Sequence, residues 1–407
     1  MVDKVNFISF RELNNLSSNH DIFFFGCSDD WVPKTLSNLN FKPKFFIDNN
    51  KDLHGKAYEG VKVIPLSKFQ KILSDKSLVI ITSGSYVSIL EDLKAININL
   101  NKIYFSPVFK DFYYLNELRS TECNVLFTSN DTNSNANRNS KYGGGVYLLN
   151  ISETSNKLKK IYSGSCRQIV KHSNDHYLFI DNSGFLVSIC IKSLKVINKF
   201  KIPRECCGLA YDEISKIGYF ACTKEEKIYK FSLKSQKFKI EKFIHFKNNP
   251  SKNNSFHIND IYLLEDRLLC SYFSFSGFWR KGIFDGGCAV IDMRNGRVEK
   301  IYSDLMQPHS PFYFNGELGI LESGTGKIYF NTYSSPVNFS GFIRGISNID
   351  RSRLLIGQSE TMYLSRVKSY KNNINMSAGF YLYDKDADCH RFISTPGICN
   401  IHDCKII

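Results

Sequence analysis

Three histidines and two arginines stand at corresponding places in a series of loosely similar segments. The polar positions of these segments are Arg167, His257, Asn259, Asp260, His309, Arg344, His402 and Asp403. Histidine transfers protons near neutral pH, so His257, His309 and His402 are the candidates for a general acid or base. Paired N–H donors suit arginine to carboxylate, sulfate or phosphate, so Arg167 and Arg344 would clamp an anionic group. The amide and the carboxylates would add further substrate contacts.

The same residue types allow two other interpretations. Three histidines with nearby carboxylates could hold a divalent metal. Guanidinium groups beside a cation are electrostatically unfavourable, so the anion is favoured slightly over the metal. The plainest alternative is that these side chains fill a channel and satisfy backbone groups at strand ends, as most buried polar groups do.

The elements that would position these residues are short strands. From Cys123 onward the chain shows strands only, in six units of about 35 to 60 residues separated by Gly/Asn turns. Such repeats are typical of a β-propeller, in which the first strand of each blade lines the central channel. The last unit has room for one strand, and residues 124–128, 145–149 and 158–162 would supply the missing ones. We predict a six-bladed propeller over residues 121–407, closed by its C-terminal strand.

Residues 1–120 differ, because strands and helices alternate there. Apolar strands at 21–25, 45–49, 61–65, 78–82 and 103–105 are separated by helical stretches at 32–39, 66–73 and 86–93. Continuous apolar strands joined by helices indicate a parallel sheet covered on both faces. We therefore predict a multidomain chain, with a small α/β domain before the all-β propeller.

The first domain resembles, over roughly residues 20–108, the Rossmann-like domain of bacterial surface-glycan proteins. The matching positions are Gly26, Asp48, Asn49 and Gly84. The resemblance would make Gly26 and Asp48 cofactor-binding residues. However, the glycine fingerprint that lets a backbone approach a pyrophosphate is broken after Gly26, and Asp29 and Asp30 place negative charge there. We therefore expect that dinucleotide binding is lost, that Gly26 forms a tight βα turn, and that Asp48 is a helix N-cap or loop residue.

Residues 250–407 resemble an uncharacterised bacterial family of surface-polysaccharide gene neighbourhoods. The resemblance rests on four ordered motifs, 257–260 (HIND), 308–311 (PHSP), 322–326 (ESGTG) and 341–345 (GFIRG), and the chain departs from the family at Gln307, Phe312 and Glu322. It implies a cytoplasmic step in glycan assembly. The protein would then be a sugar-handling enzyme, or a non-catalytic module that binds a glycan or a glycan-assembly enzyme.

Charge and cysteine content indicate which ligands and which cellular compartment suit the protein. The net charge is +14, and +12 of it lies after residue 120. Such a field would attract anionic ligands such as nucleotide sugars, phosphorylated glycans or nucleic acid. The alternative is that the charge belongs to a lysine-rich solvated surface. Of these ligands, we expect an anionic sugar or nucleotide-sugar. Nucleic-acid motifs and apolar runs long enough to span a bilayer are not found in the sequence. Twelve cysteines without a C-x-x-C pair, and an N-terminus without a signal-peptide pattern, favour free thiols in the cytoplasm.

Two loops complete the sequence hypothesis. The aromatic insert at 275–280, which contains Trp279, would stack on a sugar ring or a base, or would cover the rim of the propeller. The long loop from Glu360 to Met376 would act as a lid, and the Asn/Ser-rich loop from Asn130 to Gly144 is expected to be mobile.

Overall fold

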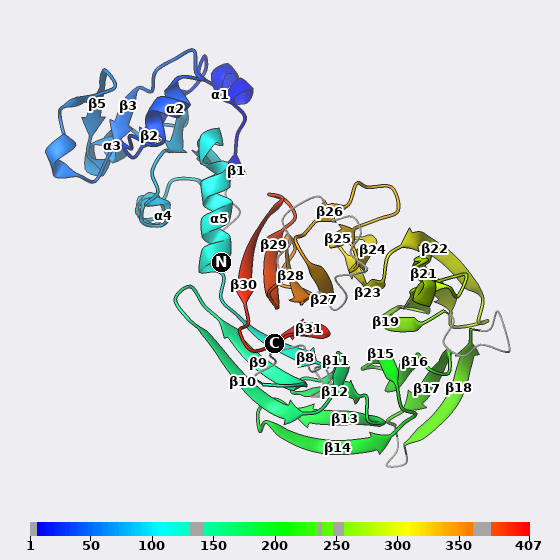
Figure 1. Cartoon of the computed structure of the whole chain (residues 1–407). Helices are drawn as coiled ribbons and strands as arrows, with labels where there is room; N and C mark the ends of the chain where they lie inside the picture. Colours follow the sequence, from blue (N-terminus) through cyan, green and yellow to red (C-terminus); the bar gives the residue numbers. More distant parts are fainter. Residues whose placement is uncertain (1–5, 131–141, 235–237, 247–255, 361–375) are drawn as a thin grey trace. The chain divides into compact units, whose positions relative to one another are not determined.

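The computed structural model describes residues 6–130, 142–234, 238–246, 256–360 and 376–407 (Figure 1). Two compact units divide the chain, Met1–Glu117 and Leu118–Ile407. Within the described ranges, no helix combines the length and the apolar character needed to cross a bilayer.

The N-terminal unit is built on one seven-stranded sheet. Its strands are β1 (Asn6–Phe7), β2 (Asp21–Phe25), β3 (Phe45–Ile47), β4 (Ala57–Tyr58), β5 (Val61–Ile64), β6 (Ser77–Ile81) and β7 (Ile103–Phe105), in the order β1-β7-β6-β2-β3-β5-β4. All neighbours are parallel except β4 and β5. The helices are α1 (Phe10–Leu16), α2 (Val32–Leu36), α3 (Leu66–Ile72), α4 (Tyr86–Ala95) and α5 (Lys110–Ser120), with 3-10 turns η1 (Lys51–Leu53), η2 (Leu100–Lys102) and η3 (Pro107–Phe109).

Both faces of this sheet are buried, as the continuous apolar strands predict. Phe23 and Phe25 of β2 pack into one apolar cluster, whereas Phe24 between them packs into another. Successive side chains of a strand point to opposite faces, so the two clusters lie on the two sides of the sheet. The helix predicted over 32–39 ends earlier, at Leu36, because the side chains of Ser37 and Asn38 bond the Lys34 carbonyl and compete with the helix.

The C-terminal unit is a six-bladed β-propeller of four-stranded antiparallel sheets. The strands of each blade are given from the innermost outward. Blade A consists of β31 (Asp403–Ile406), β8 (Cys123–Ser129), β9 (Gly145–Ile151) and β10 (Asn156–Ser163); blade B of β11 (Cys166–Ser173), β12 (His176–Asp181), β13 (Phe185–Cys190) and β14 (Lys195–Lys201); and blade C of β15 (Cys206–Asp212), β16 (Ile217–Cys222), β17 (Lys227–Ser232) and β18 (Lys239–His245). Blade D consists of β19 (Ile258–Leu264), β20 (Arg267–Tyr272), β21 (Gly286–Asp292) and β22 (Val298–Leu305); blade E of β23 (Pro308–Phe314), β24 (Glu317–Glu322), β25 (Lys327–Tyr329) and β26 (Val337–Asn338); and blade F of β27 (Phe342–Asn348), β28 (Arg353–Ser359), β29 (Gly379–Asp384) and β30 (Cys389–Ser394).

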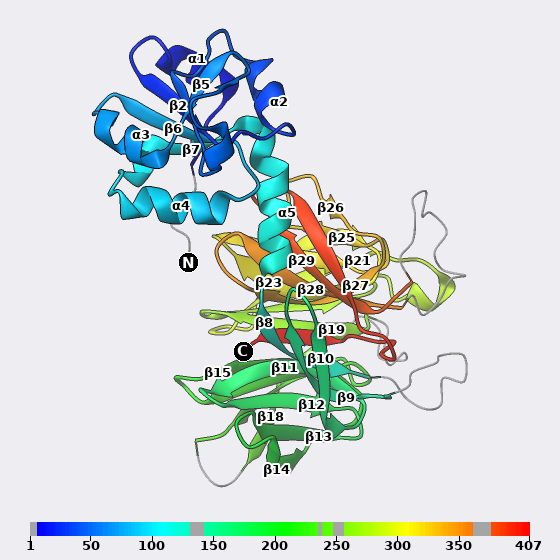
Figure 2. The same cartoon turned by 90° about the vertical axis from the view of Figure 1, so that its left-hand side faces the viewer.

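The ring is closed by its own C-terminal strand, which confirms the sequence prediction. β31 pairs antiparallel with β8, from Asp403 opposite Thr128 to Ile406 opposite Val125 (Figure 1 and Figure 2). The backbone N–H of His402, the residue just before β31, donates to the Thr128 carbonyl at 2.8 Å. Strand β31 therefore becomes the innermost strand of blade A and leaves no open edge on β8.

Apolar cores lie between neighbouring blades. In β12, Leu178 packs with Leu209 and Phe220 of blade C, whereas the adjacent Phe179 packs with Leu126 of blade A. Corresponding clusters fill the contacts between C and D, D and E, E and F, and F and A. Each blade is therefore fixed by two neighbours, and this holds the innermost strands around one axis.

Candidate functional site

A β-bulge occurs at the same place in five of the six innermost strands. The register shifts between Cys166 and Ile169 in β11, Cys206 and Gly208 in β15, Ile258 and Ile261 in β19, His309 and Phe312 in β23, and Ile343 and Ile346 in β27. A bulge adds one residue to a strand and re-aims its side chains. Arg167, Asn259, Asp260 and Arg344, all predicted from the sequence, lie within these bulges.

A belt of side-chain to backbone hydrogen bonds connects the bulged strands. Asp403 Oδ2 accepts from the Ile169 N–H at 3.1 Å, which joins blade A to blade B. Asp260 Oδ2 accepts from the Ser310 N–H at 3.0 Å. The Ser310 hydroxyl in turn accepts from the Gly345 N–H at 2.9 Å. These two carboxylates are engaged in blade assembly, and the substrate contacts predicted for them stay a prediction.

Gln168 performs the same task for three blades at once. Its Oε1 accepts from the backbone N–H groups of Leu209 at 2.8 Å and Ile261 at 3.1 Å, and its Nε2 donates to the Ile261 carbonyl at 2.9 Å. Sequence reasoning missed both Gln168 and Ser310. A signal was present for Gln168, which follows Arg167 within the same segment start.

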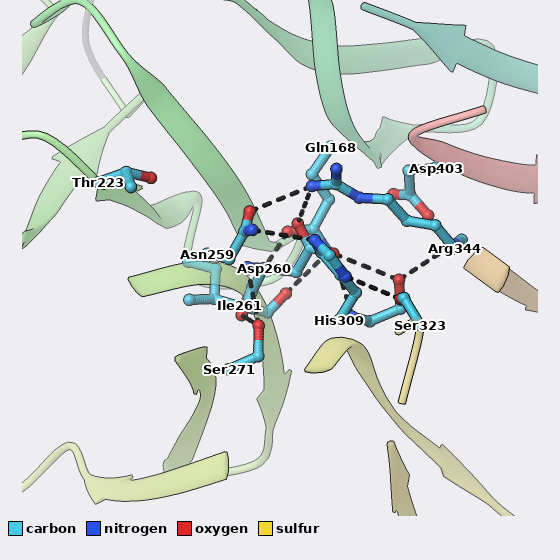
Figure 3. Close-up of polar contacts among 12 residues, drawn as sticks. Gln168, Thr223, Asn259, Asp260, Ile261, Ser271, His309, Ser323, Arg344 and Asp403 are labelled. Atoms are coloured by element: carbon cyan, nitrogen blue, oxygen red, sulfur yellow. Dashed lines mark hydrogen bonds and ion pairs between the residues drawn. The ribbon is translucent and has the colours of Figure 1, made fainter. Parts of the chain in front are cut away.

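A second chain of contacts runs through side chains alone (Figure 3). Arg344 Nη2 donates to Asn259 Oδ1 at 3.1 Å and lies 3.4 Å from Asp260 Oδ1. Asn259 Nδ2 lies 3.0 Å from His309 Nε2, and His309 Nδ1 lies 2.8 Å from the Ser323 hydroxyl. Ser323 was not predicted, although its turn was recognised as a motif. The structure thus brings together Arg344, Asn259, Asp260 and His309.

The three candidate histidines share one electrostatic environment. Burial, and then Arg344, holds the pKa of His309 well below its usual range. Burial followed by Arg344 and Arg167 does the same to the pKa of His402. Burial, Arg167 and Arg344 lower the pKa of His257 to about 3. The imidazoles are therefore neutral at pH 7, and the two arginines supply the positive charge.

Several side-chain nitrogens of this set lack a hydrogen-bond partner within the part of the chain that the structure describes. They are both ring nitrogens of His402 and the Nε atoms of Arg167 and Arg344. His402 is 0% exposed and Arg344 is 5% exposed, so bulk water does not satisfy them. We call His402, Arg167 and Arg344 the axial donor set. An unpaired buried polar group costs about 1–3 kcal/mol, so this set is suited to bind an oxyanion.

The aromatic insert extends to the same place. Trp279, in the 3-10 turn η4 (Trp279–Lys281), lies 4.6 Å from the His257 ring, measured between centroids. His257 also stacks on Phe273 at 4.3 Å, and Phe273 contacts His309 edge-on at 5.0 Å. Trp279 is therefore beside the predicted histidines, although it comes from the connection between β20 and β21.

The remaining predicted positions belong to the N-terminal unit or lie outside the described residues. Gly26 has φ +104°, and a Cβ added there would lie 2.3 Å from Ser83 Cβ, so the residue serves a tight turn. Asp48 Oδ2 accepts from the Cys27 N–H at 2.8 Å, which engages the first amide of that turn. Most of the predicted lid and of the Asn/Ser-rich loop, residues 361–375 and 131–141, are not described.

A metal centre finds little support at this axis. Among the described residues, three or more His, Cys, Asp or Glu side chains do not gather in a way that could hold a metal ion. His309 uses both ring nitrogens within the protein, and Arg344 adds positive charge beside it. The donor set is therefore better matched to an anion.

Comparisons with known proteins find one domain family of unknown function and several solved structures of low sequence identity. A family model described as a domain of unknown function (DUF4915) matches residues 251–379, which include Asn259, His309 and Arg344. No curated protein matches the chain. The similar solved structures include a chain of the nidogen/laminin complex (TM-score 0.47, 9% identity, 70% of this chain and 98% of that chain). A second is a protein from Lactobacillus plantarum, with a TM-score of 0.47 and 10% identity over 70% of this chain and 100% of that chain. A third is regucalcin, a calcium-binding protein from Agrobacterium tumefaciens, with a TM-score of 0.42 and 12% identity over 57% of this chain and 74% of that chain.

Proposed function

We propose that the propeller binds an anionic sugar or nucleotide-sugar at its axis. The oxyanion would contact the axial donor set, and the Trp279 ring would lie against the sugar or base. The observation that carries this proposal is the group of side-chain nitrogens without a partner among the described residues, on buried His402 and Arg344 and on Arg167. A bound anion would accept from the N–H groups among these nitrogens and compensate the buried positive charge of Arg344, whose contact with the Asp260 carboxylate is 3.4 Å long.

Binding is better supported than proton transfer by His309. Its Nε2 faces Asn259 and its Nδ1 faces Ser323, so each ring nitrogen already has a partner. His402 keeps both nitrogens available among the described residues. If the site is catalytic, His402 is therefore the favoured acid or base, with surface-glycan assembly in the cytoplasm as a context that would supply the ligand.

We further infer that the N-terminal unit is Rossmann-like. Numbering its parallel strands from β2 gives the order 3-2-1-4-5, which is the order of a dinucleotide-binding sheet. The engagement of the turn amide of Cys27 by Asp48 supports a unit that does not bind a dinucleotide. A docking role for this unit, with ligand binding left to the propeller, would agree with both features.

The test is calorimetric titration of the full chain with glucuronate, glucose 1-phosphate, UDP-glucose and neutral glucose. We expect at least one anionic ligand to bind, and neutral glucose to bind far more weakly. Arg167→Gln should weaken the anion about 10- to 100-fold, because a charge-assisted hydrogen bond contributes about 1.5–3 kcal/mol. Arg351→Gln, an exposed change at the β27–β28 turn of blade F, should bind as the wild type does.

Two results would reject the proposal. One is that none of the anionic ligands binds the folded wild-type protein. The other is that Arg167→Gln binds them as tightly as Arg351→Gln does. A melting curve for each variant confirms that it is folded before its affinity is compared.

A further inference from the structure

We propose that the connection between β20 and β21 is a membrane-contact loop that binds a bilayer surface rich in anionic lipid headgroups. This loop, residues 274–285, is called the blade D insert below. The inference does not depend on the axial ligand, because it rests on groups that face solvent.

The base of the insert is pre-organised by hydrogen bonds. Asp285 Oδ1 accepts from the Phe275 N–H at 3.0 Å, and Oδ2 accepts from the Ser276 N–H at 2.9 Å. The Ser274 hydroxyl accepts from the N–H groups of Gly277 at 3.0 Å and Phe278 at 3.1 Å. A loop closed in this way holds its tip in one conformation, so the side chains at the tip are displayed rather than randomly exposed.

The displayed side chains are large and apolar. Phe275 is 52% exposed, Phe278 is 38% exposed and Ile283 is 51% exposed. Leaving three such groups within nine residues in water gives up the free energy that their burial would provide. Clustered exposed apolar groups of this kind usually mark an interaction surface.

Cations accompany the rings. Lys281 Nζ lies 4.9 Å from the Phe278 centroid, Lys300 Nζ lies 4.9 Å from the Phe275 centroid, and the Arg280 guanidinium lies 5.0 Å from the Trp279 centroid. Residues 274–284 contain no Asp or Glu, and Asp285 is turned to the loop base. The surface presented is thus apolar and positively charged.

This combination matches a membrane interface. Aromatic and aliphatic side chains insert at the boundary between headgroups and acyl chains, while Lys and Arg extend their charged ends to the phosphates. Each cation near an anionic surface strengthens binding by roughly 1 kcal/mol, equivalent to about fivefold. Charge complementarity therefore favours anionic lipid over a neutral surface.

Vesicle flotation of the full chain tests the inference. We expect co-flotation with vesicles of phosphatidylcholine mixed with phosphatidylglycerol, and little with phosphatidylcholine alone. Lys281→Gln and Lys300→Gln should each weaken binding about fivefold. Ile283→Asp should weaken binding more strongly, because it removes an apolar contact and adds a negative charge.

Matched changes elsewhere serve as controls. Ile214→Asp alters a side chain that is 93% exposed in blade C, and Lys195→Gln neutralises an exposed lysine in blade B. Both should float as the wild type does. The inference is overturned if the wild type fails to float with the mixed vesicles, or if Ile283→Asp floats as well as Ile214→Asp. Failure of flotation would leave the axial proposal intact, since that is measured with soluble ligands.

Discussion

Asn259 donates a hydrogen bond from Nδ2 to Nε2 of His309, across 3.0 Å. The orientation of the amide follows from Arg344, which donates to Asn259 Oδ1. His309 therefore carries its proton on Nδ1 and donates it to the Ser323 hydroxyl. A single buried imidazole thus connects blade D to blade E, while Arg344 connects blade D to blade F. This role makes His309 important for stability, whatever the axial ligand is.

The first prediction concerns this network. His309→Ala leaves Asn259 Nδ2 and the Ser323 hydroxyl without their partner in a buried place, so we expect the free energy of unfolding to fall by about 3 kcal/mol. Urea denaturation measures it. His176→Ala, at the partly exposed β11–β12 hairpin, should cost less than about 1 kcal/mol. Equal costs for the two variants would contradict the structural role of His309.

The second prediction concerns pH. The pKa of His402 is about 6.5 in the unfolded chain, whereas burial holds it well below this in the folded protein. Below about pH 6.5 the unfolded state therefore binds a proton that the folded state does not, and stability falls as the pH falls. His402→Gln should make the decline between about pH 6 and pH 5 shallower by about 1 kcal/mol per pH unit. Denaturation curves at several pH values measure the two slopes, and identical slopes would disprove the effect.

The third prediction compares two glycines of similar backbone conformation. Gly345 has φ +79°, and a Cβ there would lie 2.8 Å from the Asp403 Cα of the closing strand. Gly296 has φ +75° and no atom within 4 Å of such a Cβ. Gly296→Ala should cost about 1 kcal/mol through its backbone alone. Gly345→Ala should lower the free energy of unfolding by at least about 2 kcal/mol more than Gly296→Ala does, because the added methyl group would force blades F and A apart. Thermal unfolding of the two variants measures the loss of stability. Equal losses for Gly345→Ala and Gly296→Ala would show that blades F and A do not approach this closely.

The fourth prediction tests ring closure. Deleting residues 403–407 removes β31, exposes the edge of β8 and removes the contact from Asp403 to Ile169. We expect a protein that unfolds at a much lower temperature and self-associates in sedimentation velocity. Deleting Ile407 alone, beyond the end of β31, should leave both properties close to those of the wild type. A shortened chain that melts and sediments normally would show that closure does not depend on this strand.

The sequence alone determined the alternation of elements, the six propeller units and the closing strand. These features follow from local apolar patterning and from the incomplete last unit, which are visible without coordinates. The same pattern located Arg167, Asn259, Asp260 and Arg344, because strand starts in a propeller face the axis. Several local bounds were wrong. The helix at 32–39 ends at Leu36, where the Ser37 and Asn38 side chains bond the Lys34 carbonyl. The helix at 86–93 runs on to Ala95, and the strands at 45–49 and 61–65 end at Ile47 and Ile64.

Only the tertiary structure decided which polar groups are paired and which are left for a ligand. Asp403 finds Ile169 across 234 positions, and Asn259 finds His309 across 50. Bulges re-aim these side chains, and the direction each one takes depends on the neighbouring blade rather than on its own strand. Whether a buried histidine is satisfied, as His309 is, or keeps free nitrogens among the described residues, as His402 does, therefore follows from how the blades pack.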